Sequence, residues 1–140
     1  MKSELIGSRD RAKQLLAFDD LNWGKIRPTD IDLSLDFGGK VFVFGELKSG
    51  NAGLTTGQRI HLQGLVRGLR KGGLIAYAFR ANHNTPDNEH DVHVAEAEVK
   101  SVYEGDGWET PRGSMTVLDF MNDIHERHIR PTRRLTGLGK

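Results

Sequence analysis

Residues 29–49 read TDIDLSLDFGGKVFVFGELKS, and this segment predicts two strands joined by a tight turn. Over Asp30–Phe37, polar and apolar residues alternate, which is typical of a strand with one buried face. Gly38-Gly39 is typical of a hairpin turn. Val41–Lys48 begins with four apolar residues in a row, which indicates a central strand buried on both faces.

The length of the turn determines which residues of the two strands face each other. A three-residue loop places Asp32 opposite Glu46 and Asp30 opposite Lys48. A two-residue loop places Ile31 opposite Glu46 and turns the aspartates to the other face of the hairpin. The glycine pair permits either register.

In the first register, two carboxylates face each other at cross-strand distance. Like charges in that position are destabilising, so each carboxylate needs a cation. Lys48 supplies one positive charge at this end of the strand. A divalent metal would supply the rest, and the hard carboxylate oxygens of Asp32 and Glu46 suit Mg²⁺.

The rest of the chain predicts helices and strands that complete an α/β fold. The order strand–helix–strand implies a right-handed crossover, so the strand after the central helix should lie parallel to Val41–Lys48 in a mixed sheet. We expect the first helix and the central helix to flank this sheet. In chain order, the expected elements are a helix over Ser8–Phe18, a helix from Thr55 or Thr56 to Arg70, a buried strand over Leu74–Phe79, an edge strand over Val92–Tyr103, a short strand at Trp108 and a helix that begins at Thr116.

The chain has 140 residues, which is the size of one ordinary domain. We expect that domain to span residues 1–126 and a basic, flexible tail to span residues 127–140. The chain has no cysteine, which excludes a disulfide scaffold, a cysteine-based zinc site and a thiol nucleophile. The charged N-terminus is unlike a signal peptide, and the longest apolar run is too short to cross a membrane. We expect a cytoplasmic protein of a bacterium or of a phage-infected cell.

The formal net charge of +1 hides an uneven distribution of charge. Residues 47–86 contain six bases and no acid, whereas residues 87–124 contain ten acids and two bases. Such segregation indicates a basic face that binds a polyanion and an acidic face that is turned away from it. DNA is the partner that we expect.

The triplet Glu-x-Lys occurs twice, in different surroundings. Glu98 and Lys100 share one face of an alternating strand, which indicates a solvated pair. Glu46 and Lys48 end a buried strand, where two charges are costly unless they are paired or used. The second context favours Glu46 and Lys48 as the functional pair.

Three motifs in this order resemble those of the PD-(D/E)XK nuclease superfamily, and the chain is most similar to its small phage-encoded members. The motifs are Thr29-Asp30-Ile31-Asp32, Gly45-Glu46-Leu47-Lys48 and Thr55-Thr56-Gly57-Gln58-Arg59. Thr29-Asp30 stands where the family has Pro-Asp, with Pro28 one place early, which leaves open whether Asp30 or Asp32 is a metal ligand. We favour Asp32, since it lies further inside the strand and opposite Glu46.

The resemblance implies a restriction-endonuclease-like core and a metal-dependent nuclease that hydrolyses DNA phosphodiester bonds. Asp32 and Glu46 would bind one or two Mg²⁺ ions, for which Mn²⁺ could substitute, with the backbone carbonyl of Leu47 as a further ligand. Lys48 would orient the attacking water or stabilise the charge that develops on the phosphate. We expect structure-selective or nonspecific cleavage in phage or bacterial DNA recombination, repair or replication.

The central helix supplies further site candidates. Gln58 falls on the apolar stripe of this helix, so it should point inward toward the strand end that carries Lys48. Arg59 points elsewhere and is a candidate for phosphate contact, and we expect Arg67 and Arg70 to bind nucleic acid as well.

Many members of the family add an acidic ligand from their first helix, and Glu4 and Asp10 are the candidates here. We expect Trp23 and Trp108 to be packing residues rather than platforms for base stacking. A homodimer would supply two active sites for two strands. The alternative function is a non-catalytic DNA-binding or inhibitor protein on the same fold, but such a protein has no need of Asp32, Glu46 and Lys48 together.

Overall fold

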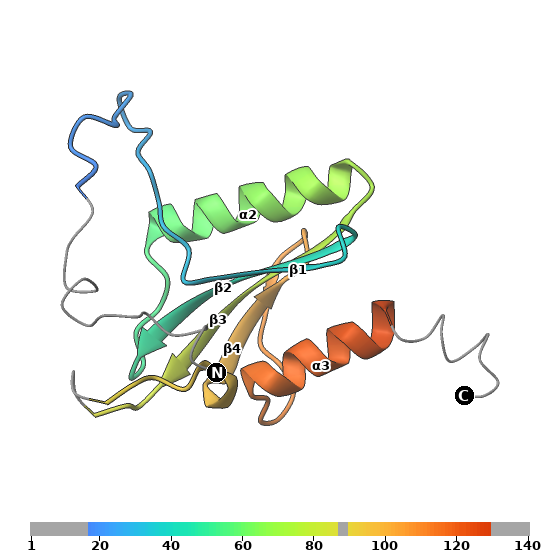
Figure 1. Cartoon of the computed structure of the whole chain (residues 1–140). Coiled ribbons are helices and arrows are strands. Elements are labelled where there is room, and N and C mark those ends of the chain that lie inside the picture. The colour runs from blue at the N-terminus through green and yellow to red at the C-terminus, as the bar shows by residue number, and fades with distance from the viewer. Residues whose placement is uncertain (1–16, 87–89, 130–140) are drawn as a thin grey trace.

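The computed structural model describes residues 17–86 and 90–129, which form a five-stranded sheet between two helices (Figure 1). The expected helix over Ser8–Phe18 lies almost entirely outside these residues, and Ala17 and Phe18 belong to no helix. In chain order, the elements are β1 (Leu33–Phe37), β2 (Val41–Ser49), α2 (Thr56–Lys71), β3 (Ile75–His83), the 3₁₀ turn η2 (Val94–Glu96), β4 (Glu98–Tyr103), β5 (Trp108–Glu109) and α3 (Val117–His128).

The strands are ordered β1-β2-β3-β4-β5 across the sheet. β2 and β3 are parallel and are connected through α2, while every other neighbouring pair is antiparallel. The mixed sheet of an α/β fold is therefore confirmed. The expectation that Val92–Tyr103 forms an edge strand was wrong, because β4 pairs with β3 on one side and with β5 on the other.

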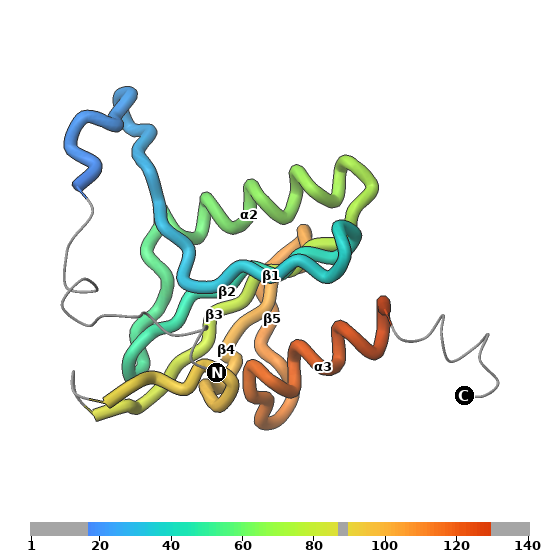
Figure 2. Tube along the Cα trace, in the orientation of Figure 1, coloured from blue at the N-terminus to red at the C-terminus, as the bar shows by residue number. Residues whose placement is uncertain are grey.

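The two helices cover opposite faces of the sheet, as Figures 1 and 2 show. On one face, Leu62 and Val66 of α2 pack against Phe44, Ala78 and Tyr103. The expected partner layer was the first helix, but within residues 17–86 and 90–129 the second face is covered by α3. α2 therefore covers the face of the sheet to which Phe44 of β2 points.

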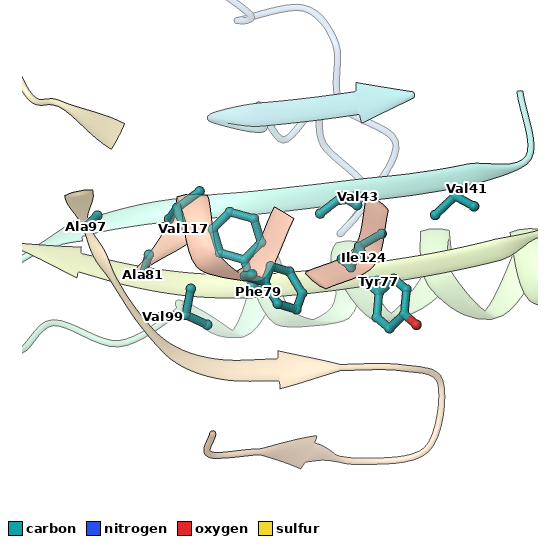
Figure 3. Close-up of a cluster of buried hydrophobic side chains, with 10 residues drawn as sticks. Val41, Val43, Tyr77, Phe79, Ala81, Ala97, Val99, Val117 and Ile124 are labelled. Atoms are coloured by element: carbon teal, nitrogen blue, oxygen red, sulfur yellow. The ribbon is translucent and has the colours of Figure 1, made fainter. Parts of the chain in front are cut away.

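The α3 face holds the larger buried cluster (Figure 3). Val117 and Ile124 of α3 lie against strand residues that include Val43 and Phe79, and the Phe79 ring meets Phe120 edge-on at 5.5 Å. This apolar layer fixes the position of β2 and β3 beneath the polar residues on the other face.

The hairpin has the three-residue loop, so the register that opposes the two carboxylates is confirmed. Phe37 pairs with Val41 and Leu33 pairs with Gly45, and continuing this register places Asp32 opposite Glu46. The loop glycines Gly38 and Gly39 have φ values of +72° and +79°, which side-chain-bearing residues rarely adopt. β1 is shorter than predicted, because the backbone N–H of Leu47 bonds to the carboxylate of Asp32 rather than continuing the ladder.

α2 begins and ends close to the predicted residues. Thr55 is its N-cap, and Thr55 and Gln58 form a reciprocal capping box. Gly72 and Gly73 follow its last turn, after which the chain returns as β3. β3 continues four residues past its predicted end at Phe79, since it pairs with β2 as far as His83.

The predicted tail boundary at residue 126 was wrong. α3 continues to His128, and Arg127 forms an ion pair with Asp123 one turn earlier. His128 Nε2 lies 2.7 Å from the hydroxyl of Tyr77, so the last turn of α3 is packed on the sheet. Residues 130–140 lie outside the part that the structure describes. Within that part, no helix combines the length and the apolar character needed to cross a membrane.

Candidate metal and phosphate site

The candidate site lies at the carboxyl end of β2, on the sheet face that α2 covers. Phe44 and Ala78 contact α2, and side chains two residues further along a strand point to the same face. Glu46 and Lys48 of β2 and Arg80 of β3 therefore share that face. The first turn of α2 lies over the same end of the sheet (Figure 1).

Asp32 is held beside this strand end by a backbone hydrogen bond. The N–H of Leu47 donates to Asp32 Oδ2 at 2.8 Å. Asp32 is exposed, so its second oxygen can meet solvent or a ligand. Asp30 is also exposed and close enough for its charge to act on Glu46, but the bond to Leu47 singles out Asp32 as the carboxylate fixed at the site.

Glu46 is a buried carboxyl with an incomplete set of partners. Only 2% of its surface is exposed. Its Oε1 accepts a hydrogen bond of 3.3 Å from Gln58 Nε2, while its buried Oε2 has no hydrogen-bond donor among the described residues. The pKa of Glu46 is raised to about 7, mainly by burial and in addition by contact with and repulsion from the Asp32 carboxyl. Lys48 acts in the opposite direction.

Gln58 points inward as predicted, and the residue that it meets is Glu46. Its side-chain carbonyl accepts from the N–H of Thr55, and its amide nitrogen donates to Glu46. The start of α2 is thus joined to the buried carboxyl through one side chain. Lys48 is half-buried, and it forms no ion pair with another residue of the described part of the chain.

Asp32 and Glu46 are the candidate ligands for a metal ion at this site. In residues 17–86 and 90–129, no group of three or more His, Asp or Glu side chains could hold an ion. Mg²⁺ is ordinarily bound through one or two carboxylates plus water and phosphate oxygens, so Asp32 and Glu46 fit that chemistry. The orphaned Oε2 of Glu46 supports the fit. Glu4 and Asp10 lie outside the described residues, and the Leu47 carbonyl as a ligand stays a prediction.

Arg80 is a candidate that the sequence did not reveal. In the parallel register it lies directly beside Glu46. Its Nε is buried and has no acceptor among the described residues, and its Nη1 is 3.1 Å from the point where a Cβ on Gly53 would stand. Asn82 fixes the same loop by donating to the carbonyls of Gly50 and Ala52. One feature of the sequence could have pointed to Arg80, because it lies in the acid-free segment 47–86. The strand that corresponds to β3 was, however, expected to end at Phe79, before Arg80.

The three arginines predicted to bind nucleic acid lie at different distances from Glu46. Arg59 is in the first turn of α2, with its guanidinium 5.9 Å from the centre of the Trp108 ring. Arg67 donates to the hydroxyl of Tyr103 and Arg70 donates to the carbonyl of Ala76. Twelve residues separate Gln58 from Arg70, about 18 Å along the helix, so Arg70 is far from the carboxylates.

The structure distinguishes the two Glu-x-Lys triplets. Lys100 Nζ and Glu98 Oε1 form an ion pair at 3.2 Å, and both side chains are partly exposed, as predicted for a solvated pair. The two tryptophans also differ. Trp108 packs on Tyr103 with ring centres 5.3 Å apart, as predicted, whereas Trp23 is 65% exposed and its predicted packing role was wrong.

The chain matches no family model, and neither a curated protein nor a solved structure is significantly similar to it. The resemblance to the PD-(D/E)XK superfamily therefore stays a prediction from three motifs. The α/β architecture and the positions of Asp32, Glu46, Lys48 and Gln58 are what the structure adds.

Proposed function

We propose that this protein is a Mg²⁺-dependent nuclease that hydrolyses phosphodiester bonds in DNA. The observation that carries the proposal is the pairing of Asp32 with buried Glu46 at a strand end that also carries Lys48. Two carboxyls this close repel each other when both are ionised, and a divalent cation relieves that repulsion. A module that only binds DNA gains nothing from a buried carboxyl with a second carboxylate beside it.

Asp32 and Glu46 are the residues that would hold the metal. A bound Mg²⁺ supplies a water of lowered pKa and neutralises charge on the phosphate. Gln58 holds one oxygen of Glu46 through its amide, which leaves the second oxygen for the ion. The bond from Leu47 in the same way fixes one oxygen of Asp32.

Cations on the same face would receive the substrate. Lys48 follows Glu46 by two residues and is half-buried, so its ammonium is suited to orient the water or to stabilise charge on the phosphate. Arg80 pairs with Glu46 across β2 and β3, and its buried Nε has no acceptor among the described residues. Structure-selective or nonspecific cleavage is the specificity that we expect.

The test is a cleavage assay on supercoiled, linear, single-stranded and branched DNA with Mg²⁺, with Mn²⁺ or with EDTA. Asp32→Asn, Glu46→Gln and Lys48→Ala should each reduce cleavage at least 100-fold, since each removes a metal ligand or a charge at the reacting phosphate. The second triplet provides matched controls, because Glu98→Gln and Lys100→Ala change the same residue types at an exposed ion pair. These controls should cleave as the unchanged protein does.

The outcomes separate the candidate functions. Metal-dependent cleavage that survives in both Asp32→Asn and Lys48→Ala would reject the assignment of the site. DNA binding without cleavage under any metal would favour a non-catalytic DNA-binding protein on the same architecture.

A further inference from the structure

An exposed apolar turn precedes the candidate site. The backbone N–H of Trp23 donates to the carbonyl of Ile26 at 2.9 Å, and the N–H of Ile26 donates back to Trp23 at 3.1 Å. These bonds close a two-residue turn over Gly24 and Lys25, with Gly24 at φ +68°. Residues that exchange both backbone bonds lie directly opposite and point their side chains to the same face. The side chains of Trp23 and Ile26 therefore form one apolar surface, which we call the wedge.

This wedge is unusually open to solvent. Trp23 is 65% exposed and Ile26 is 70% exposed, more than any other large apolar side chain that the structure describes. Beside the turn lies a hollow of mixed polar and apolar character, lined by Phe18, Asp19, Leu21, Asn22, Arg27 and Pro28. An exposed aromatic side chain gains free energy when a flat apolar face covers it.

The charges around the wedge favour a polyanion as the occupant. Lys25 sits at the tip of the turn and Arg27 directly follows Ile26, while the nearest acids in the sequence are Asp19 and Asp20 before the turn and Asp30 after it. A second copy of the chain is disfavoured, because turn-to-turn contact would bring these cations together. A nucleic-acid strand offers both required features, since its bases have flat faces and its backbone is anionic.

The turn is also within reach of the site. Ile26 precedes Asp32 by six residues, which is at most about 21 Å of chain. Figures 1 and 2 show this blue segment rising past the first turn of α2, at the end of the sheet where β2 ends. A base a few nucleotides away from a phosphate at Asp32 and Glu46 can therefore meet the wedge.

We propose that the Trp23–Ile26 turn binds single-stranded DNA by stacking an unpaired base on Trp23. Lys25 and Arg27 would hold the adjacent phosphates, and Ile26 would exclude water from the stacked face. The inference relies on the proposed function for its choice of DNA as the ligand. It adds a binding surface outside the carboxylate site and a preference for unpaired strands.

The test uses Trp23 as its own probe. The chain has two tryptophans, so Trp108→Phe leaves Trp23 as the sole indole fluorophore. A single-stranded oligonucleotide, added in EDTA so that no metal-dependent cleavage takes place, should quench this emission, and a blunt duplex should quench it less. In the unchanged background, Trp23→Ala should weaken binding of the single strand about 10-fold or more, and Trp23→Phe should retain most of it. Leu118→Ala removes another exposed apolar side chain, on α3, and should have no effect.

Three results would overturn the inference. The first is oligonucleotide binding, measured by anisotropy, that leaves Trp23 emission and the affinity of Trp23→Ala unchanged. The second is shielding of Trp23 from acrylamide in the free protein, which would show that protein already covers it. The third is the absence of any binding to single strands. If metal-dependent cleavage is observed in any of these cases, the proposed nuclease function is retained. Quenching of Trp23 emission without cleavage would support DNA binding at the turn and reject the nuclease function.

Discussion

Asp32 accepts a hydrogen bond from the backbone N–H of Leu47, at 2.8 Å, across the end of the β1–β2 hairpin. This bond links Asp32, which lies opposite Glu46 on the neighbouring strand, to Leu47, which follows Glu46 in the sequence. It ends the strand ladder with a carboxylate instead of a carbonyl, so a metal ligand candidate takes the place of one backbone pair. The three-residue loop at Gly38 and Gly39 makes the bond possible, because a two-residue loop would turn Asp32 to the other face.

The stability of the metal-free protein should fall as pH rises from about 4.5 to 7. The folded Glu46 carboxyl, with its pKa raised to about 7, keeps a proton that the unfolded chain releases near 4.5. The folded state then binds more protons over this window, so the free energy of unfolding decreases by on the order of 3 kcal/mol. Chemical denaturation at several pH values in EDTA measures this loss.

Glu46→Gln provides the control for this pH dependence, since an amide does not titrate. Subtracting its profile from that of the unchanged protein should leave the contribution of Glu46. Mg²⁺ should raise the melting temperature of the unchanged protein more at pH 8 than at pH 5.5, because protons compete with the metal at low pH. Equal stabilisation at both pH values, or identical profiles for the two proteins, would contradict the assignment.

The sequence revealed the hairpin and the site carboxylates because both depend on local patterns. Alternation over residues 30–37 and the apolar run after Val41 indicate strands, and two glycines indicate the turn. The register was left open, since Gly38-Gly39 is compatible with two loop lengths. The structure chooses between them through contacts such as Asp32 with Leu47, which are distant in sequence.

The role of Arg80, the exposure of Trp23 and the pairing of β4 on both sides were missed for different physical reasons. A charged residue after an apolar run suggests that a strand has ended, but Arg80 is stabilised by parallel pairing with β2. Apolar side chains are usually buried, so the exposure of Trp23 has no local signature. Alternation in β4 indicates one solvated face and does not indicate how many strands pair with it.

Gln58→Ala should impair both the fold and the reaction, whereas Thr55→Ala should impair only the fold. Removing the Gln58 amide leaves both oxygens of buried Glu46 without a donor from the described residues, at a cost of about 1–3 kcal/mol. Thr55→Ala loses the side-chain cap, worth about 1 kcal/mol, and leaves the Gln58–Glu46 bond intact. Denaturation curves and Mg²⁺ titrations of cleavage on both variants make the comparison. A loss of cleavage in Thr55→Ala as large as in Gln58→Ala would show that Gln58 acts through the helix cap alone.

Gly45→Ala should destabilise the protein and weaken cleavage, because Phe79 occupies the space of the missing side chain. A Cβ on Gly45 would stand 2.2 Å from Phe79 Cζ, so β2 or the ring must move, at a cost of about 1–3 kcal/mol or more. Movement of β2 would also displace the adjacent Glu46. Thermal melts and cleavage rates measure the two effects.

Gly64→Ala is the matched control for this change. A Cβ at Gly64 would have no atom within 4 Å beyond its own helix surroundings, and alanine in the interior of α2 should stabilise the helix by about 0.5–1 kcal/mol. Phe79→Leu should lessen the damage of Gly45→Ala in a double-mutant cycle, since it shortens the clashing ring. Additive losses from the two changes would mean that the clash is not the cause.

Arg80→Gln should weaken DNA binding and make the remaining binding less sensitive to salt. Arg80 pairs with Glu46 in the sheet, its buried Nε has no acceptor among the described residues, and we expect a phosphate at the metal site to supply one. Losing one phosphate contact should reduce the slope of log K against log salt by about 0.9 for duplex DNA. Arg80→Lys should keep part of the affinity, because the charge remains while the fork of donors is lost.

Exposed Arg112, in the acidic segment, provides the control, and Arg112→Gln should leave the slope unchanged. An unchanged slope in Arg80→Gln, together with a lower melting temperature, would assign Arg80 to balancing the charge of Glu46 instead of contacting DNA.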